Sequence, residues 1–138
     1  MHSSKDERKA LTDFSERYAR SSSPVVEEIE RKVIGEVWGA NGFTTAAQAD
    51  LLANLLDLGP GTRLLDFGTG RGWPGLYLAK RTGCEVVLTD LPAEGLTVAA
   101  HRAKNEGVRL VGPIVASARN LPFGKYSFDA VVHTDVLC

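Results

Sequence analysis

Residues 64–79 constrain the fold of this chain more than any other stretch. They read Leu-Leu-Asp-Phe-Gly-Thr-Gly-Arg-Gly-Trp-Pro-Gly-Leu-Tyr-Leu-Ala. A short apolar run ending in a carboxylate predicts a buried strand, the glycines predict a tight turn, and the segment from Pro74 predicts a helix. An open α/β sheet binds its ligand at such a strand-to-helix turn. The ligand of this turn is therefore the first question about function.

The chain before residue 59 is expected to be helical, with helices over about 5–20, 24–37 and 45–58. Capping boxes at 4–7 and 45–48 begin the first and third helices, and Ser23-Pro24 begins the second. The second helix should carry one apolar face, formed by Val26, Ile29, Val33 and Val37.

From residue 59 onward, strands and helices alternate. We expect strands over about 62–67, 85–90, 109–116 and 128–133, with helices over 74–81 and 92–106. Such alternation predicts an α/β fold of parallel strands with right-handed crossovers. Pro113 has no amide for the sheet ladder, so its strand should lie at an edge, as it does in the order 3-2-1-4. The predicted organisation is an N-terminal helical segment, 1–58, packed on a core of 59–138.

Composition limits the classes of partner. The formal net charge of −1 gives no electrostatic reason to expect nucleic acid or an anionic membrane surface. The polar N-terminus lacks the apolar run of a signal peptide, and no apolar stretch approaches the length of a membrane span. Cys84 and Cys138 form neither a metal-binding spacing nor a disulfide framework. These features favour a cytoplasmic protein without a metal site.

Two ligands are compatible with the glycines. Residues 70–75 match G-x-G-x-x-G, and Asp90 follows at the distance of a ribose-binding acid, as in NAD(P)-dependent oxidoreductases or epimerases. However, Asp66 would repel a pyrophosphate, and Pro74 removes one amide that could bind phosphate. A carboxylate suits a ligand carrying an ammonium or sulfonium charge. The frame that fits is D-x-G-x-G-x-G, filled by Asp66, Gly68, Gly70 and Gly72.

Three motifs in order then resemble the class I S-adenosylmethionine-dependent methyltransferases over about residues 62–138. They are 64–72, the strand 86–90 ending in an acid, and 117–123 followed by 126–132. The resemblance implies a three-layer Rossmann-like sheet, S-adenosyl-L-methionine as cofactor and a small-molecule methyl acceptor. It also implies cofactor contacts from Asp66, Gly68, Thr69, Gly70, Gly72, Asp90, Leu91, Ser117, Ala118 and His133.

The implied roles differ among these residues. The glycines would admit the methionine part of the cofactor, Asp66 would hold its amino group, and Asp90 would accept both ribose hydroxyls. Leu91 would pack on the adenine. The family often has an acid at the position of Ser117, so the serine departs from the pattern, although its hydroxyl can still accept a hydrogen bond.

Methyl transfer mainly requires alignment of donor and acceptor and, for some acceptors, a base. The resemblance places the end of the fourth strand beside the methyl group. There His133 is a candidate base and Asp135 a candidate orienting group, while packing or solvent exposure is the alternative for His133. His2 and His101 are expected at the surface. Tyr18, Trp38 and Phe43 could either anchor the N-terminal helices or cover the ligand cleft.

The chain stops where the family continues with further strands. We expect a C-terminally truncated methyltransferase, either a fragment or a natural form, whose acceptor half is largely missing. Its fourth strand would be an open sheet edge, which favours a homodimer or a partner that covers it. A non-catalytic cofactor-binding subunit completed by a partner is the remaining alternative.

Overall fold

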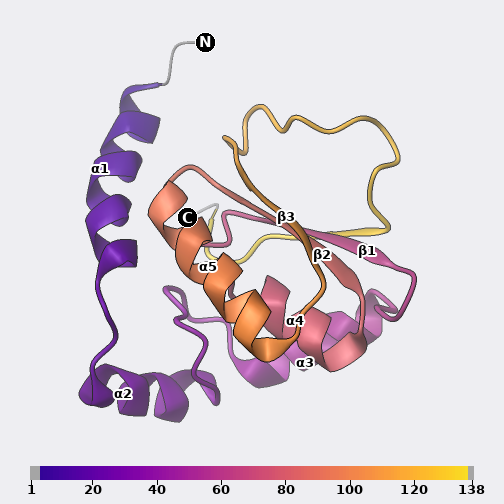
Figure 1. Cartoon of the computed structure of the whole chain (residues 1–138), viewed down its shortest axis with the longest axis horizontal. Helices are drawn as coiled ribbons and strands as arrows, with labels where there is room; N and C mark the ends of the chain where they lie inside the picture. Colours follow the sequence, from indigo (N-terminus) through magenta and orange to yellow (C-terminus); the bar gives the residue numbers. More distant parts are fainter. Residues whose placement is uncertain (1–3, 137–138) are drawn as a thin grey trace.

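The computed structural model describes residues 4–136, so the predictions for His2 and Cys138 lie outside the described residues. Helices and strands alternate after an all-helical start (Figure 1). In chain order the elements are α1 (Lys5–Ala19), α2 (Pro24–Ile34), α3 (Ala46–Leu55), β1 (Arg63–Phe67), α4 (Gly75–Thr82), β2 (Glu85–Asp90), α5 (Ala93–Glu106), β3 (Leu110–Val115) and β4 (Ala130–Val132).

The helix starts are those that the sequence predicts. Capping boxes begin α1 at Ser4 and α3 at Thr45, and the Ser23 hydroxyl accepts a hydrogen bond from the first turn of α2. Helix α2 ends earlier than expected, at Ile34, because the next residue, Gly35, turns the backbone into the left-handed region at φ +94°.

Most of the apolar face expected on α2 lies at the surface. Val26, Ile29 and Val33 are exposed, whereas Glu30 and Ile34 are buried. Glu30 turns inward because its carboxylate accepts hydrogen bonds of 2.8 Å from the backbone amides of Trp38 and Ala40. The helix is therefore oriented by a buried carboxylate that accepts hydrogen bonds from amides of the following loop.

The sheet is parallel throughout, with the strand order β3-β2-β1-β4 that the sequence predicts. Pro113 lies in β3, at one edge of this sheet, where the amide it lacks is not needed by a further neighbour. Strand β4 forms the other edge. Asp66, opposite Leu88 and Val132 in the register, lies near the carboxyl end of the central strand β1.

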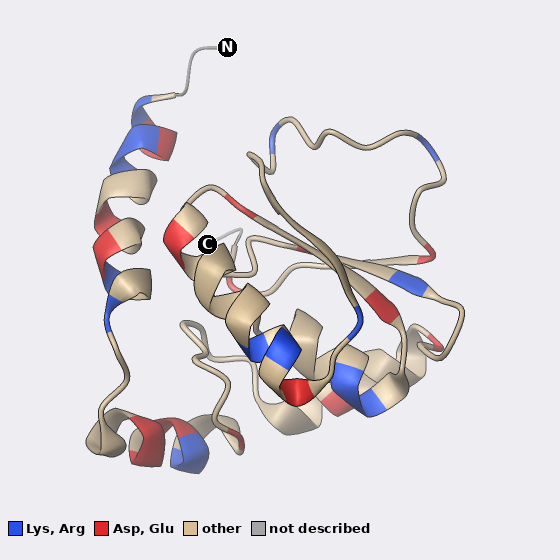
Figure 2. Ribbon diagram, in the orientation of Figure 1, with Lys and Arg blue, Asp and Glu red and all other residues tan. Residues whose placement is uncertain are grey.

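Helices α4 and α5 cover one face of the sheet, with α3 against α4 and α1 against α5 (Figure 1). The core lies between this face and these helices, and includes Leu64, Leu76, Val86, Leu88 and Leu96. Charges of both signs are interspersed along the helices (Figure 2). Across 4–136, none of the helices combines the length and the apolarity needed to cross a membrane.

The crossover from β3 to β4 differs from the expected third layer. Residues 116–129 form a long loop without a helix, drawn in light orange to yellow in Figure 1. The loop contains an edge-to-face pair of Phe123 and Phe128, with ring centroids 4.9 Å apart. The layers in the described residues are thus the sheet and the helices on one face.

Candidate functional site

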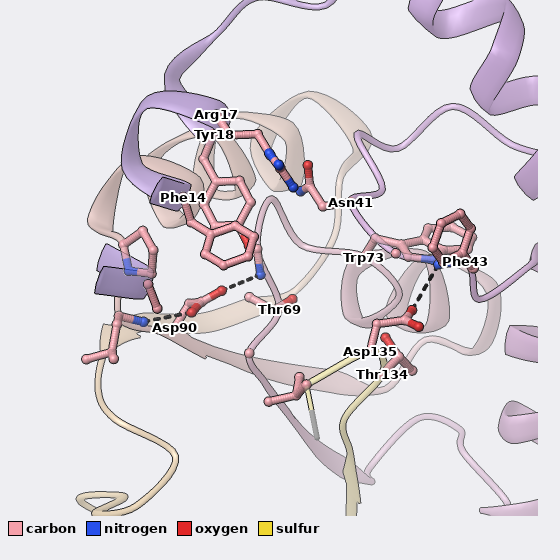
Figure 3. Close-up of a pocket in the computed structure, with 17 residues that line it drawn as sticks. Phe14, Arg17, Tyr18, Asn41, Phe43, Thr69, Trp73, Asp90, Thr134 and Asp135 are labelled. Carbon is pink, nitrogen blue, oxygen red and sulfur yellow. Dashed lines mark hydrogen bonds between the residues drawn. The ribbon is translucent and has the colours of Figure 1, made fainter. Parts of the chain in front are cut away.

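A cavity of about 430 Å³ opens at the carboxyl ends of β1, β2 and β4. This size is in the range of small-molecule sites, and the edge is the one at which open α/β sheets bind ligands. The described residues that line it come from α1, from the loop before α3 and from the three strand ends (Figure 3). They are Ala10, Phe14, Arg17, Tyr18, Asn41, Gly42, Phe43, Gly68, Thr69, Gly70, Trp73, Asp90, Leu91, Pro92, Thr134, Asp135 and Val136.

The glycine-rich turn presents backbone rather than side chains to this cavity. Gly68 and Gly70 have φ of +69° and +60°, in the left-handed region that favours glycine. A Cβ atom at Gly68 would lie 2.4 Å from a methyl group of Val136, and one at Gly70 would lie 3.3 Å from the Tyr18 hydroxyl. Side chains at these positions would therefore collide with Val136 or press on Tyr18.

Asp90 joins the second motif to this turn. Its Oδ2 accepts a hydrogen bond of 2.7 Å from the Gly70 amide, and its Oδ1 accepts one of 2.8 Å from the Leu91 amide. Burial raises the pKa of this carboxyl, against the lowering effect of the two amides. Each carboxylate oxygen still has a second lone-pair direction for a ligand hydroxyl.

Asp66 lies beneath the turn and is absent from the described residues that line the cavity. It is 1% exposed, and its Oδ2 accepts hydrogen bonds of 2.8 Å from the Thr69 hydroxyl and the Gly75 amide. Its Oδ1 has no partner among the described residues. Burial raises the pKa of Asp66 to about 7, opposed by the Thr69 and Gly75 hydrogen bonds. In this structure Asp66 shapes the turn and holds the start of α4.

Ser117 and Ala118 lie outside the cavity lining. The Ser117 hydroxyl donates a short hydrogen bond to the Glu7 carboxylate, which also caps the start of α1. This bond lowers the pKa of Glu7, which lies at the surface. Ala118 is exposed. The third motif is therefore in contact with α1, which the spacing of residues in the sequence does not predict.

The two candidate catalytic residues lie in different surroundings. His133 is exposed and stacks on Phe67, with ring centroids 4.9 Å apart, while the cavity lining includes Asp135 but not His133. Asp135 Oδ2 accepts hydrogen bonds from the Phe43 amide at 3.0 Å and from the Thr44 hydroxyl at 3.2 Å. The contacts of Asp135 thus fasten the loop before α3 to the end of β4.

Helix α1 covers the cavity with three side chains that the sequence did not single out together. Phe14 and Tyr18 form a tilted pair at 5.6 Å, and the Arg17 guanidinium lies 5.3 Å from the Phe14 ring centroid. Burial, with the charge of Asp90, raises the pKa of Tyr18 to about 12, so its hydroxyl keeps its proton. The sequence predicts the helix, but not that its side chains cover a cavity.

Of the three aromatics considered as a cover, Tyr18 and Phe43 line the cavity, whereas Trp38 lies in the core. Trp38 packs edge-on against Tyr77 at 5.9 Å. Trp73 lines the cavity instead, held by a 3.0 Å hydrogen bond from its Nε1 to the Thr44 carbonyl.

Arg71 ties the turn to the N-terminal segment. Its guanidinium donates hydrogen bonds to the carbonyls of Gly39 (3.2 Å) and Arg20 (3.4 Å) and to Oδ1 of Asn41 (3.0 Å). The residue between two glycines of the turn therefore fixes the loop that closes the cavity.

Comparison with known proteins gives a consistent result. A family model described as a methyltransferase domain matches residues 64–138. Sterol methyltransferase-like 1 of Botryococcus braunii is 35% identical over 98 residues, covering 67% of this chain and 25% of that protein. The ubiquinone/menaquinone biosynthesis C-methyltransferase UbiE of Stenotrophomonas maltophilia (strain K279a) is 33% identical over 127 residues, covering 78% of this chain and 48% of that protein.

Among solved structures, a SAM-dependent methyltransferase from Geobacter sulfurreducens, in complex with S-adenosyl-L-homocysteine, superposes with a TM-score of 0.58. It is 26% identical, and the match covers 67% of this chain and 37% of that one. The chain thus spans about a quarter to a half of the length of the proteins it matches here.

Proposed function

Because this chain belongs to the methyltransferase domain family, we propose that its cavity binds S-adenosyl-L-methionine and that the whole protein methylates a small organic acceptor. The observation that carries the proposal is the joint presence of Asp90 and the Gly68–Gly70 backbone in one cavity. The relatives named for sterol and ubiquinone/menaquinone chemistry support an acceptor of small-molecule class.

The residues present fit such a cofactor. Gly68 and Gly70 place their backbone at the wall of the cavity, and Asp90 offers acceptors suited to a pair of ribose hydroxyls. Leu91 and Pro92 give the same end of the cavity an apolar wall that suits an adenine ring. When bound, the cofactor would supply a methyl group on a sulfonium centre.

The work left to this chain is alignment and the exclusion of water. Tyr18 and Phe14 cover the turn, and Arg71 holds the closing loop in place. Asp135 holds the loop before α3 against the end of β4, because its Oδ2 accepts hydrogen bonds from the Phe43 amide and the Thr44 hydroxyl. His133 stays a candidate base only if its ring leaves Phe67, and we propose no proton transfer through it in the observed position.

A thermal-shift titration tests the proposal against the dinucleotide alternative. S-adenosyl-L-homocysteine at 100 times its dissociation constant should add about 2.7 kcal/mol to the free energy of unfolding, whereas NAD⁺ should add nothing. Stabilisation by NAD⁺ alone would overturn the proposal. Mass-spectrometric detection of a methylated acceptor then separates an enzyme from a subunit that only binds the cofactor.

A further inference from the structure

The cavity has two chemically distinct ends. Figure 3 shows Asp90 beneath the rings of Phe14 and Tyr18 at one end, and Trp73, Phe43 and Asp135 gathered at the other. The first end holds the carboxylate and the turn that we assign to the cofactor. The second end has no part in that assignment.

Phe43 is unusual at this second end. Its side chain is 81% exposed and yet lines the cavity, although a large apolar ring gains nothing from facing water. Its backbone is held, since the Phe43 amide donates a 3.0 Å hydrogen bond to Asp135. The ring is thus presented by a fixed backbone rather than carried on a loose loop.

The neighbouring residues leave this backbone little freedom. A Cβ atom at Gly42 would lie 2.0 Å from Asp135 Oδ2, so the segment approaches the carboxylate more closely than any other residue type allows. On the other side, the Thr44 carbonyl accepts a hydrogen bond from Trp73 Nε1, which fixes the indole relative to the same segment. The backbone of residues 42–44 therefore positions two aromatic rings, through the Phe43 amide bond to Asp135 and the Trp73 bond to Thr44.

We propose that this end of the cavity is the acceptor subsite, that Phe43 is its specificity-determining residue, and that the acceptor is a flat, apolar, ring-bearing molecule. The inference rests on the proposed function, because it takes the Asp90 end for the cofactor. Aromatic rings provide large contact area at low cost in conformational entropy and favour flat apolar partners.

Asp135 acts here as a positioning residue. Its Oδ2 accepts from the Phe43 amide, from the Thr44 hydroxyl and, at 3.4 Å, from the Thr44 amide. Its backbone lies in the left-handed region, at φ +57°. Loss of this carboxylate releases Phe43 without altering any contact of Asp90.

Calorimetric titration of the chain tests the proposal. The probe is 2-naphthol, a flat apolar ring with a hydroxyl that can be methylated, and myo-inositol is the polar ring control. Titrations are made with and without saturating S-adenosyl-L-homocysteine. We expect the chain to bind 2-naphthol and not myo-inositol. Phe43→Ala should lower the affinity for 2-naphthol at least tenfold, while its affinity for S-adenosyl-L-homocysteine stays within threefold of the parent.

Tyr126→Ala is the matched control, because Tyr126 is a fully exposed aromatic outside the cavity lining; its affinities should stay within twofold of the parent. Asp135→Ala should also lower the affinity for 2-naphthol, as Phe43→Ala does. If the chain binds S-adenosyl-L-homocysteine but not 2-naphthol, or if Phe43→Ala binds 2-naphthol as tightly as the parent, the acceptor subsite is overturned and the proposed function stands. If the chain binds 2-naphthol in a Phe43-dependent way but does not bind S-adenosyl-L-homocysteine, the proposed function is overturned and an apolar ligand site remains.

Discussion

Asp90 and Gly70 are joined by a hydrogen bond of 2.7 Å from the Gly70 amide to the Asp90 carboxylate, although they are 20 residues apart. The bond connects the end of β2 to the glycine-rich turn after β1. It therefore holds together, across two neighbouring strands, the two motifs that the proposed cofactor would contact. Ligand binding at this edge should consequently depend on the geometry of both motifs together.

Gly72 should be far less tolerant of a side chain than a glycine outside the turn. Its φ is +98°, and a Cβ atom there would lie 2.6 Å from Leu76 Cδ1 and 3.2 Å from Ala99 Cβ. Backbone strain and overpacking together predict that Gly72→Ala lowers the free energy of unfolding by about 2–4 kcal/mol, measured by urea denaturation. The matched change is Gly59→Ala, where a Cβ meets nothing within 4 Å. Equal stability of the two variants would contradict the described turn.

The buried carboxyl of Asp66 should make stability depend on pH. Its pKa is raised to about 7 in the folded protein, mainly by burial, whereas an exposed aspartate titrates near 3.9. Between about pH 4 and pH 7 the folded state therefore binds more protons than the unfolded state. Its contribution to stability then falls as the pH rises through this window, by an amount on the order of 4 kcal/mol. The Asp66→Asn variant has a side chain that is neutral at every pH, so its stability should lack this pH-dependent contribution.

The comparison is made by urea unfolding at pH 5 and pH 8. The pKa of Asp90 is also raised by burial, but Asp90 is present in both proteins, so the difference between them reports Asp66. Asp129→Asn serves as the control, because Asp129 is an exposed aspartate that accepts a hydrogen bond from the Arg63 amide. A parent and an Asp66→Asn variant with parallel pH profiles would show that Asp66 is not held as described.

Removal of the Arg71 side chain should loosen the loop that closes the cavity. Arg71→Ala deletes hydrogen bonds to Gly39, Arg20 and Asn41. Amide hydrogen exchange over residues 37–44 should become at least tenfold faster, while exchange in β1 and β2 stays unchanged. Arg109→Ala, which removes an exposed arginine beside Glu85, should leave the loop as it is. Unaltered exchange in Arg71→Ala would mean that other contacts hold the loop.

Local signals predicted much of the fold. Capping residues marked the helix starts, Pro113 placed β3 at an edge, and the alternation after residue 59 predicted a parallel sheet. These features depend on neighbours a few residues apart, which a sequence displays directly. Apolar spacing could not show which side of α2 is buried, because Glu30 faces inward to accept hydrogen bonds from the amides of the following loop.

The site was only half predictable, for the same reason. The turn and Asp90 carry a recognisable pattern, but their cover does not. Asp135 meets Thr44 from 91 residues away, and Ser117 meets Glu7 from 110 residues away. Gly95 looked like any helical glycine, yet a Cβ there would lie 2.4 Å from the Gly70 carbonyl oxygen. Only the packed chain shows that α5 presses on the turn at this point.

The most direct test of the proposed function is the calorimetric affinity for S-adenosyl-L-homocysteine of the parent chain, Asp90→Ala and Asp57→Asn. Asp57 is an exposed aspartate at φ +51°, a conformation that asparagine tolerates, so Asp57→Asn controls for the loss of a carboxylate. We predict that the parent and Asp57→Asn bind alike and that Asp90→Ala binds at least 100-fold more weakly, a loss of about 2.7 kcal/mol. Unchanged affinity in a folded Asp90→Ala variant, or no binding by the folded parent, would contradict the account.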